Sequence, residues 1–197
     1  TVLVDVPIGL PEASSARACD AAARAYLRAP RASSVFNPPT RAALHASSWA
    51  EAARLNERAC GKRISRQTWG LVPKIREVDA FLRADTARQD RLREAHPEVL
   101  FQILNDGISL THGKKSSDGR AERLGILETF EADARAHFGA AAERYRRYEA
   151  HPDDILDAMG AALVASRAPE LESWPARPPR DAAGLRCEIV VPSGSGR

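Results

Sequence analysis

The sequence predicts an α/β protein that is rich in helix and has few strands. Its 197 residues include 44% hydrophobic and 28% charged residues, which is typical of a globular chain long enough to bury a core. Three short apolar runs are typical of strands, and apolar residues recur at helical spacing through most of the remaining chain. No apolar run approaches the roughly 20 residues that a transmembrane helix requires, which excludes a membrane-spanning protein.

The strands are expected at the beginning, the middle and the end of the chain. They cover residues 1–4, 91–95 and 187–191. So few short strands form a poor sheet for many helices to cover, which suggests that strands are missing upstream of Thr1. The chain also begins without a methionine and contains a single one, Met159, as expected of a processed or truncated protein.

The helices are delimited by capping residues, prolines and glycines. They are expected from Ser14 or Ser15 to Pro30, from Pro38 to Gly61, from Pro73 through Leu82, from Glu98 to Leu104, from Ala121 to Glu149 with a break near Gly139, and from Pro152 through Val164. Loops are expected at residues 64–70, 113–119 and 175–179, and a disordered tail at residues 192–197.

The charge and the cysteines set weak limits on the partner and the compartment. The net charge is +3, and only four of the 29 basic residues are lysines. This arginine richness fits codon bias in a GC-rich genome, or alternatively a basic functional surface. The three cysteines form no C-x-x-C pair, which predicts a reduced, cytoplasmic protein rather than a disulfide scaffold or a zinc ribbon.

Candidate site residues follow the first two predicted strands. Asp5 ends the first strand, where ligands collect in open α/β sheets, and capping of a turn explains it equally well. Glu94 and His96 lie on one face of the second strand, because alternate strand residues point the same way. Glu98 follows them, and a role in complementing a helix dipole explains it well.

The strongest single signal is a group of aspartates at the start of the last helix. Asp154 and Asp157 are three residues apart, so they share a helix face and are able to hold one divalent cation between them. The helix dipole explains Asp153 in the first turn, but it explains Asp157 poorly.

Basic residues that follow or precede these acids are candidates for binding phosphate. Lys114 and Lys115 lie in a polar loop before a helix, which is typical of an anion cradle and nearly as typical of a solvated loop. Lys74 belongs to a helix that mixes both charge signs, as salt-bridged helix surfaces do. The common nucleotide-binding, hydrolase and zinc-protease motifs are absent from the sequence.

Several of these motifs occur in an order that resembles domain-of-unknown-function family 429, a predicted RNase H-like nuclease family. The similar segments span nearly the whole chain and are D-V-P-I-G-L-P at 5–11, R-A-C-D at 17–20 with Arg24, S-V-F-N-P at 34–38, Q-T-W at 67–69, P-K-I-R-E-V-D at 73–79, E-A-H-P-E at 94–98, Lys114 and Lys115 with Gly119 and Arg123, and D-D-I-L-D-A at 153–158.

The resemblance implies an RNase H-like mixed sheet flanked by helices, in one domain over residues 1–191. Such domains begin with hairpin strands, the first of which carries a central aspartate, and both are missing here, which leaves the chain helix-rich. Asp5 matches the acid after the fourth strand and Glu94 the acid after the fifth. Asp154 and Asp157 match the acid pair of the closing helix.

The activity that the resemblance implies is two-metal hydrolysis of phosphodiester bonds with Mg²⁺ or Mn²⁺, provided that the missing acid is present. The metal ligands are expected to be Asp5, Glu94, Asp154 and Asp157, with His96 as an additional catalytic residue. Nucleic acid is the expected substrate, and the residues expected to bind it are Arg17, Lys74, Lys114, Lys115 and Arg123. The alternatives are a non-catalytic module of this fold that binds nucleic acid or a protein, and a phosphotransferase of this fold.

Overall fold

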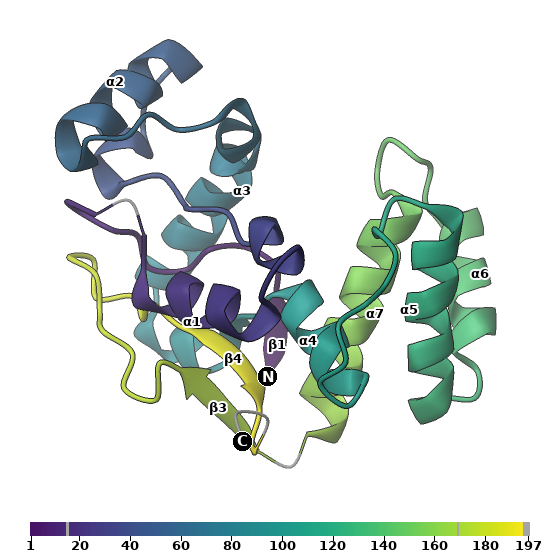
Figure 1. The fold of residues 1–197 in the computed structure, drawn as a ribbon. Helices are drawn as coiled ribbons and strands as arrows, with labels where there is room; N and C mark the ends of the chain where they lie inside the picture. The colour runs from purple at the N-terminus through teal and green to yellow at the C-terminus, as the bar shows by residue number, and fades with distance from the viewer. Residues whose placement is uncertain (15, 169, 195–197) are drawn as a thin grey trace.

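A computed structural model describes residues 1–14, 16–168 and 170–194 (Figure 1). Its α-helices are α1 (Ala18–Leu27), α2 (Trp49–Cys60), α3 (Arg66–Arg83), α4 (Pro97–Leu104), α5 (Ser117–Phe130), α6 (Ala134–Arg144) and α7 (Pro152–Arg167). Short 3-10 helices cover Arg31–Ser34, Arg41–Ala43 and Thr86–Asp90. The strands are β1 (Val2–Val4), β2 (Leu92–Glu94), β3 (Leu171–Trp174) and β4 (Ile189–Pro192).

The strands form two small sheets between two groups of helices. In Figure 1, α5, α6 and α7 lie side by side at the right, while α2 and α3 form the opposite lobe. Strands β1 and β2 pair in parallel, and β3 and β4 pair antiparallel. The prediction of a helix-rich α/β protein is confirmed. The single mixed sheet expected of an RNase H-like fold is not seen, because the strands of the described residues form two separate two-stranded sheets.

The core consists of clusters that join these elements. Residues of α1, including Cys19 and Leu27, pack against Ile189 and Val191 of β4. A second cluster joins α4, α5 and α7 around the fully buried Phe101. A third joins β1 and β4 to α4 and α7. These contacts pack β1 and α7 against a common set of residues from α4 and β4.

Several predicted boundaries were wrong for local reasons. Helix α3 begins at Arg66, inside the predicted loop, because the Ser65 hydroxyl caps it by accepting a hydrogen bond from the Thr68 amide at 2.9 Å. Pro73 therefore lies inside this helix and not in its first turn. The predicted break near Gly139 instead falls between Phe130 and Ala134, and Gly139 lies within α6.

The second sheet contains a strand that the sequence did not reveal. Strand β3 follows α7 and pairs along its whole length with β4. Its Ser173 hydroxyl donates to Glu188 at 2.6 Å, and Arg93 of β2 bonds both residues. Strand β4 extends through Pro192, into the segment predicted as a disordered tail, of which residues 195–197 lie outside the described residues.

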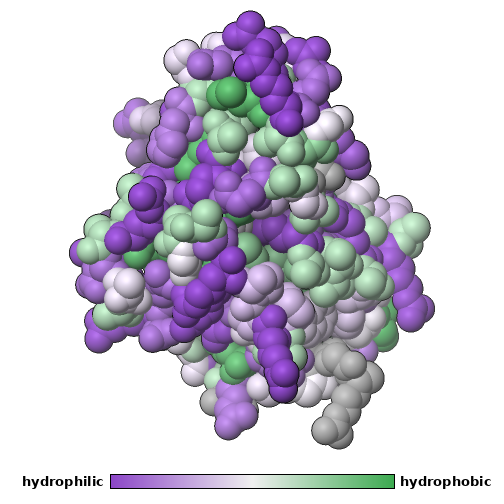
Figure 2. All heavy atoms as spheres, turned by 90° about the vertical axis from the view of Figure 1, so that its left-hand side faces the viewer, coloured by the Kyte–Doolittle hydropathy of each residue, from purple (hydrophilic) through white to green (hydrophobic). Residues whose placement is uncertain are grey.

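Apolar character can be followed in the exposed residues and in the helices. On the face shown in Figure 2, hydrophilic residues dominate and strongly hydrophobic ones occur in small separate patches. Within the described residues, no helix is both long enough and apolar enough to cross a bilayer.

Candidate functional site

A large open cavity lies where the two parallel strands end. Its volume is about 1010 Å³, and it is lined from the β1 end, α3, the start of α4, the loop before α5 and the start of α7. The titratable residues that line it include Asp5, Lys74, Glu94, His96, Glu98, Lys114, Lys115, Arg120, Arg147, His151, Asp153 and Asp154. Most of the site residues predicted from the sequence therefore meet around one cavity.

The sheet register brings the first acid to this cavity. Val4 pairs with Glu94, so Asp5 and Ala95 both follow the carboxyl ends of their strands. The Asp5 side chain is open to the cavity and makes no hydrogen bond or ion pair with any described residue. The surrounding protein desolvates this carboxyl and raises its pKa, while the charges of His96 and Lys114 oppose the shift.

The start of α7 supplies three further carboxylates. Pro152 occupies the first turn, where its missing N–H costs nothing, and the Asp154 carboxylate accepts a hydrogen bond from the His151 amide at 3.0 Å. Asp153 and Asp154 line the cavity. Asp157 lies one turn further along and is buried.

Lys114 provides a cation for this acidic group. Its ammonium donates to Asp157 Oδ2 at 2.6 Å, and the charges of Asp5 and Asp153 also act on it. The other oxygen of Asp157, Oδ1, is buried without a hydrogen-bond partner among the described residues. Burial raises the pKa of Asp157 to about 6, although Lys114 opposes that rise.

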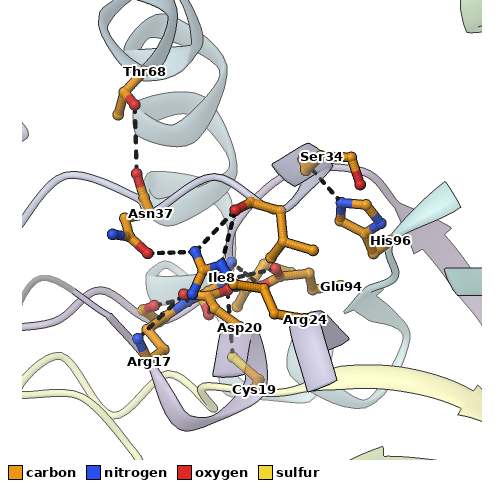
Figure 3. Close-up of polar contacts among 12 residues, drawn as sticks. Ile8, Arg17, Cys19, Asp20, Arg24, Ser34, Asn37, Thr68, Glu94 and His96 are labelled. Atoms are coloured by element: carbon orange, nitrogen blue, oxygen red, sulfur yellow. Dashed lines mark hydrogen bonds and ion pairs between the residues drawn. The ribbon is translucent and has the colours of Figure 1, made fainter. Parts of the chain in front are cut away.

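Glu94 reaches the cavity wall but is held by Arg17 (Figure 3). Arg17 donates from Nη1 to Glu94 Oε2 at 2.7 Å and from Nη2 to Glu94 Oε1 at 2.6 Å. The same guanidinium bonds Asp20 through Nε at 3.0 Å and Nη2 at 2.6 Å, and the Ile8 amide donates to Glu94 at 2.6 Å. Burial raises the pKa of Glu94 to about 7 against the effect of Arg17, and the two carboxylates raise that of Arg17.

Arg17 and Arg123 are both paired with carboxylates, although Arg17 also lines the cavity, and their expected role in binding substrate stays a prediction. Arg123 is fully buried, pairs with Glu98 and lies with its guanidinium carbon 5.5 Å from the Phe101 ring centroid. Both arginines are buried beside these carboxylates. Charged side chains are stable there because each has an opposite charge and hydrogen bonds.

Two lysines, unlike these arginines, are exposed at the cavity. Lys74 and Lys115 line the cavity, are exposed and form no side-chain hydrogen bond or ion pair with a described residue. His96 caps α4, and its Nε2 lies 3.4 Å from the Ser34 carbonyl oxygen while Nδ1 is buried without a partner. These groups are therefore available to a bound ligand.

A divalent cation fits only part of the predicted ligand set. Asp5 and the orphaned Oδ1 of Asp157 are hard oxygen donors of the kind that Mg²⁺ and Mn²⁺ prefer. Both oxygens of Glu94 are already taken by Arg17. In the part of the chain described, no three His, Cys, Asp or Glu side chains are grouped closely enough to hold a metal ion.

Sequence reasoning passed over two parts of this cavity. Asp153 was explained by the helix dipole, yet it lines the cavity. The segment Arg144–Tyr148 was taken as part of a long helix, yet α6 ends at Arg144 and the residues after it carry Arg147 to the cavity. The available signal was the R-Y-R-R-Y run at 144–148, in which three arginines and two tyrosines stand together.

The fold and the cavity define a helix-rich α/β protein with acidic and basic groups gathered at the ends of two parallel strands. The chain belongs to the family described as Protein of unknown function (DUF429), whose model matches residues 1–180. No curated protein and no solved structure matches the chain.

Proposed function

We propose that this protein is a metal-dependent hydrolase of phosphodiester bonds in nucleic acid. The observation that carries the proposal is the Asp5 carboxyl, which is open to the cavity and unpaired beside exposed, unpaired Lys74 and Lys115. Acids that bind a divalent cation next to free lysines are the groups that phosphodiester hydrolysis requires.

The protein ligands in this proposal are Asp5 and Asp157, with water molecules completing the coordination of Mg²⁺ or Mn²⁺, and Asp154 lines the same cavity. Such an ion, when bound, lowers the pKa of a water molecule and stabilises charge on phosphate oxygens. We propose one ion in place of two, because the fourth expected ligand, Glu94, gives both oxygens to Arg17.

Lys114 has two roles in the proposed site. It neutralises Asp157 while the site is empty of cations, and its side chain is one-third exposed and lines the cavity. A bound phosphate offers the ammonium a new anionic partner when a metal ion takes Asp157. Lys74 and Lys115 hold the flanking phosphates, and the His96 ring is placed to orient a water molecule.

A calorimetric titration with Mn²⁺ tests the metal site. The wild-type protein is expected to bind the ion, and Asp5→Asn and the double variant Asp154→Asn/Asp157→Asn are expected to lose it. Glu143→Gln is the matched control, because it removes one negative charge from an exposed position on α6 outside the cavity lining. If the Asn variants bind Mn²⁺ as tightly as the wild type, the ligand assignment is wrong.

A cleavage assay then tests the chemistry. Labelled DNA and RNA are incubated with the protein and Mg²⁺ or Mn²⁺, with a chelator as the blank. Asp5→Asn is expected to slow cleavage by about a hundredfold or more, since even the outer partners of metal ligands cost 10–100-fold.

A second function, binding of nucleic acid without turnover, is favoured by one observation. Lys114 already supplies the cation that Asp157 needs, at 2.6 Å. In that case oligonucleotides bind in a salt-dependent manner with no metal requirement, and no cleavage is detected.

A further inference from the structure

The segment Arg144–Tyr148, which begins at the last residue of α6 and leads toward α7, presents arginines and tyrosines to solvent. We call it the Arg–Tyr rim. Tyr145 is 46% exposed and Tyr148 is 78% exposed, the highest value among the exposed large hydrophobic residues of the described chain. Aromatic rings are usually buried because of their apolar area, so two exposed rings within four residues point to a binding surface.

Among the described residues, the arginines of the rim have no carboxylate partner in an ion pair. The side chains of Arg146 and Arg147 form no hydrogen bond or ion pair with a described residue. The guanidinium carbon of Arg144 lies 5.8 Å from the centroid of the Tyr145 ring. The rim therefore combines free positive charge with exposed aromatic faces.

The backbone of the rim is held in a defined turn. The Glu149 amide donates to the Arg146 carbonyl oxygen at 2.8 Å, and the Ala150 amide donates to the same oxygen at 3.1 Å. The Glu149 carboxylate in return accepts a hydrogen bond from the Arg146 amide at 2.8 Å. A turn closed in this way presents its side chains at low entropic cost to a ligand.

The rim is continuous with the candidate site. Arg147 and His151 line the same cavity as Asp5 and Lys115. A ligand that reaches the acids of the cavity is therefore also within the cavity that Arg147 of the rim lines.

We propose that the Arg–Tyr rim binds single-stranded nucleic acid, with bases stacked on Tyr148 and Tyr145 and phosphates held by Arg146 and Arg147. Exposed rings contact base faces only where the bases are unpaired, because in a duplex those faces are stacked on each other. This inference rests on the proposed function for the place of the strand in the cavity, and it narrows the substrate class from nucleic acid in general to single strands.

The test is oligonucleotide binding in the absence of metal, measured by fluorescence anisotropy. The probes are a short labelled oligothymidylate, the matching oligouridylate and a duplex hairpin. The wild type is expected to bind the single strands more tightly than the hairpin. Tyr148→Ala is expected to weaken single-strand binding by about fivefold to a hundredfold, the effect of losing one stacked base.

Two further variants separate stacking from general damage. Tyr148→Phe keeps the ring and is expected to bind nearly as the wild type does. Phe81→Ala is the matched control, because Phe81 is 46% exposed and lies under the Arg88 guanidinium at 4.3 Å but does not line the cavity. Arg147→Gln is expected to reduce the slope of log affinity against log salt by about 0.7, the value for one phosphate contact on a single strand.

The outcomes separate this inference from the proposed hydrolysis. If Tyr148→Ala binds like the wild type, or the hairpin binds as tightly as the single strands, the inference is overturned even when Asp5→Asn abolishes cleavage. If none of the oligonucleotides binds, the inference is likewise overturned, and the rim is a surface for another class of partner. If Tyr148→Ala weakens binding while no cleavage is found, the inference stands and the hydrolase proposal fails.

Discussion

Replacement of Arg17 with methionine removes the cation that Glu94 and Asp20 share inside the protein. The Arg17 and Glu94 side chains are 2% and 7% exposed, and Asp20 is 1% exposed. Water therefore does not compensate for the lost charge. Breaking a buried ion pair from one side typically costs about 3–5 kcal/mol, because the other charge is left without a partner. We expect Arg17→Met to lose this amount of unfolding free energy at pH 8.

The loss is expected to depend on pH, with a sign that follows from Glu94. Its pKa is raised from the ordinary 4.5 to about 7 in the wild type, so wild-type folding takes up a proton mainly between these two pH values. Without Arg17 to oppose burial, the pKa rises further and the variant takes up this proton above pH 7 as well. Above pH 7 its stability therefore falls by up to about 1.4 kcal/mol per pH unit relative to the wild type.

Urea unfolding at pH 6 and pH 8 measures both effects. Arg135→Met is the matched control, since Arg135 also binds a carboxylate through two hydrogen bonds, at 2.7 and 2.9 Å, but is 67% exposed. An exposed pair contributes about 0–1 kcal/mol. Arg17→Lys keeps the charge and is expected to lose less unfolding free energy than Arg17→Met. This variant provides the test if the methionine variant does not fold. The reasoning is refuted if Arg17→Met is as stable as the control variant, or if its loss is the same at both pH values.

Two further predictions concern the acids and the loop of the site. Relative to the wild type, Asp157→Asn is expected to gain up to about 3 kcal/mol of unfolding free energy between pH 4 and pH 8. Burial raises the pKa of Asp157 from 3.8 to about 6, so ionisation of this carboxyl destabilises the wild-type fold as the pH rises through that value. Urea unfolding that shows the same effect of the substitution at both pH values would contradict this. Gly119→Ala is expected to cost about 1–3 kcal/mol and to weaken oligonucleotide binding, since its Cβ would lie 2.0 Å from the Gly113 carbonyl oxygen and displace the loop that carries Lys114. The Cβ of Gly125→Ala, on the same helix, meets nothing within 4 Å, so this variant is expected to gain up to about 1 kcal/mol of unfolding free energy. Thermal unfolding should therefore show a lower midpoint for Gly119→Ala and a higher one for Gly125→Ala.

The acids of the site were predictable because they follow local rules. Asp5 comes directly after a β-branched run, and α7 begins at Pro152 with aspartates in its first two turns. These patterns locate strand and helix ends without knowledge of the rest of the chain. Parallel pairing of β1 and β2 then brings Asp5 to the edge predicted for it.

The roles of the buried charges were not predictable in the same way. Arg17 and Lys74 are both basic residues in helical segments, yet one is buried between two carboxylates and the other is exposed at the cavity. Glu94 lies 77 residues from Arg17 in sequence, so nothing local marks their pairing. Strand β3 was missed for a related reason, because its pairing with β4 is set by contacts across the fold.

The sequence by itself determined the helix-rich α/β class, the strand that precedes Asp5 and the acidic start of α7, since backbone hydrogen bonding and capping depend on neighbouring residues. Only the tertiary structure decided which charges are available. It assigned Arg17 and Arg123 to internal carboxylates, left Lys74, Lys115 and Asp5 unpaired at one cavity, and placed Arg147 at the rim of that cavity. The physical reason is that the pairing of charges depends on their distance and burial in the folded protein. Both are determined by residues that lie far apart in the chain.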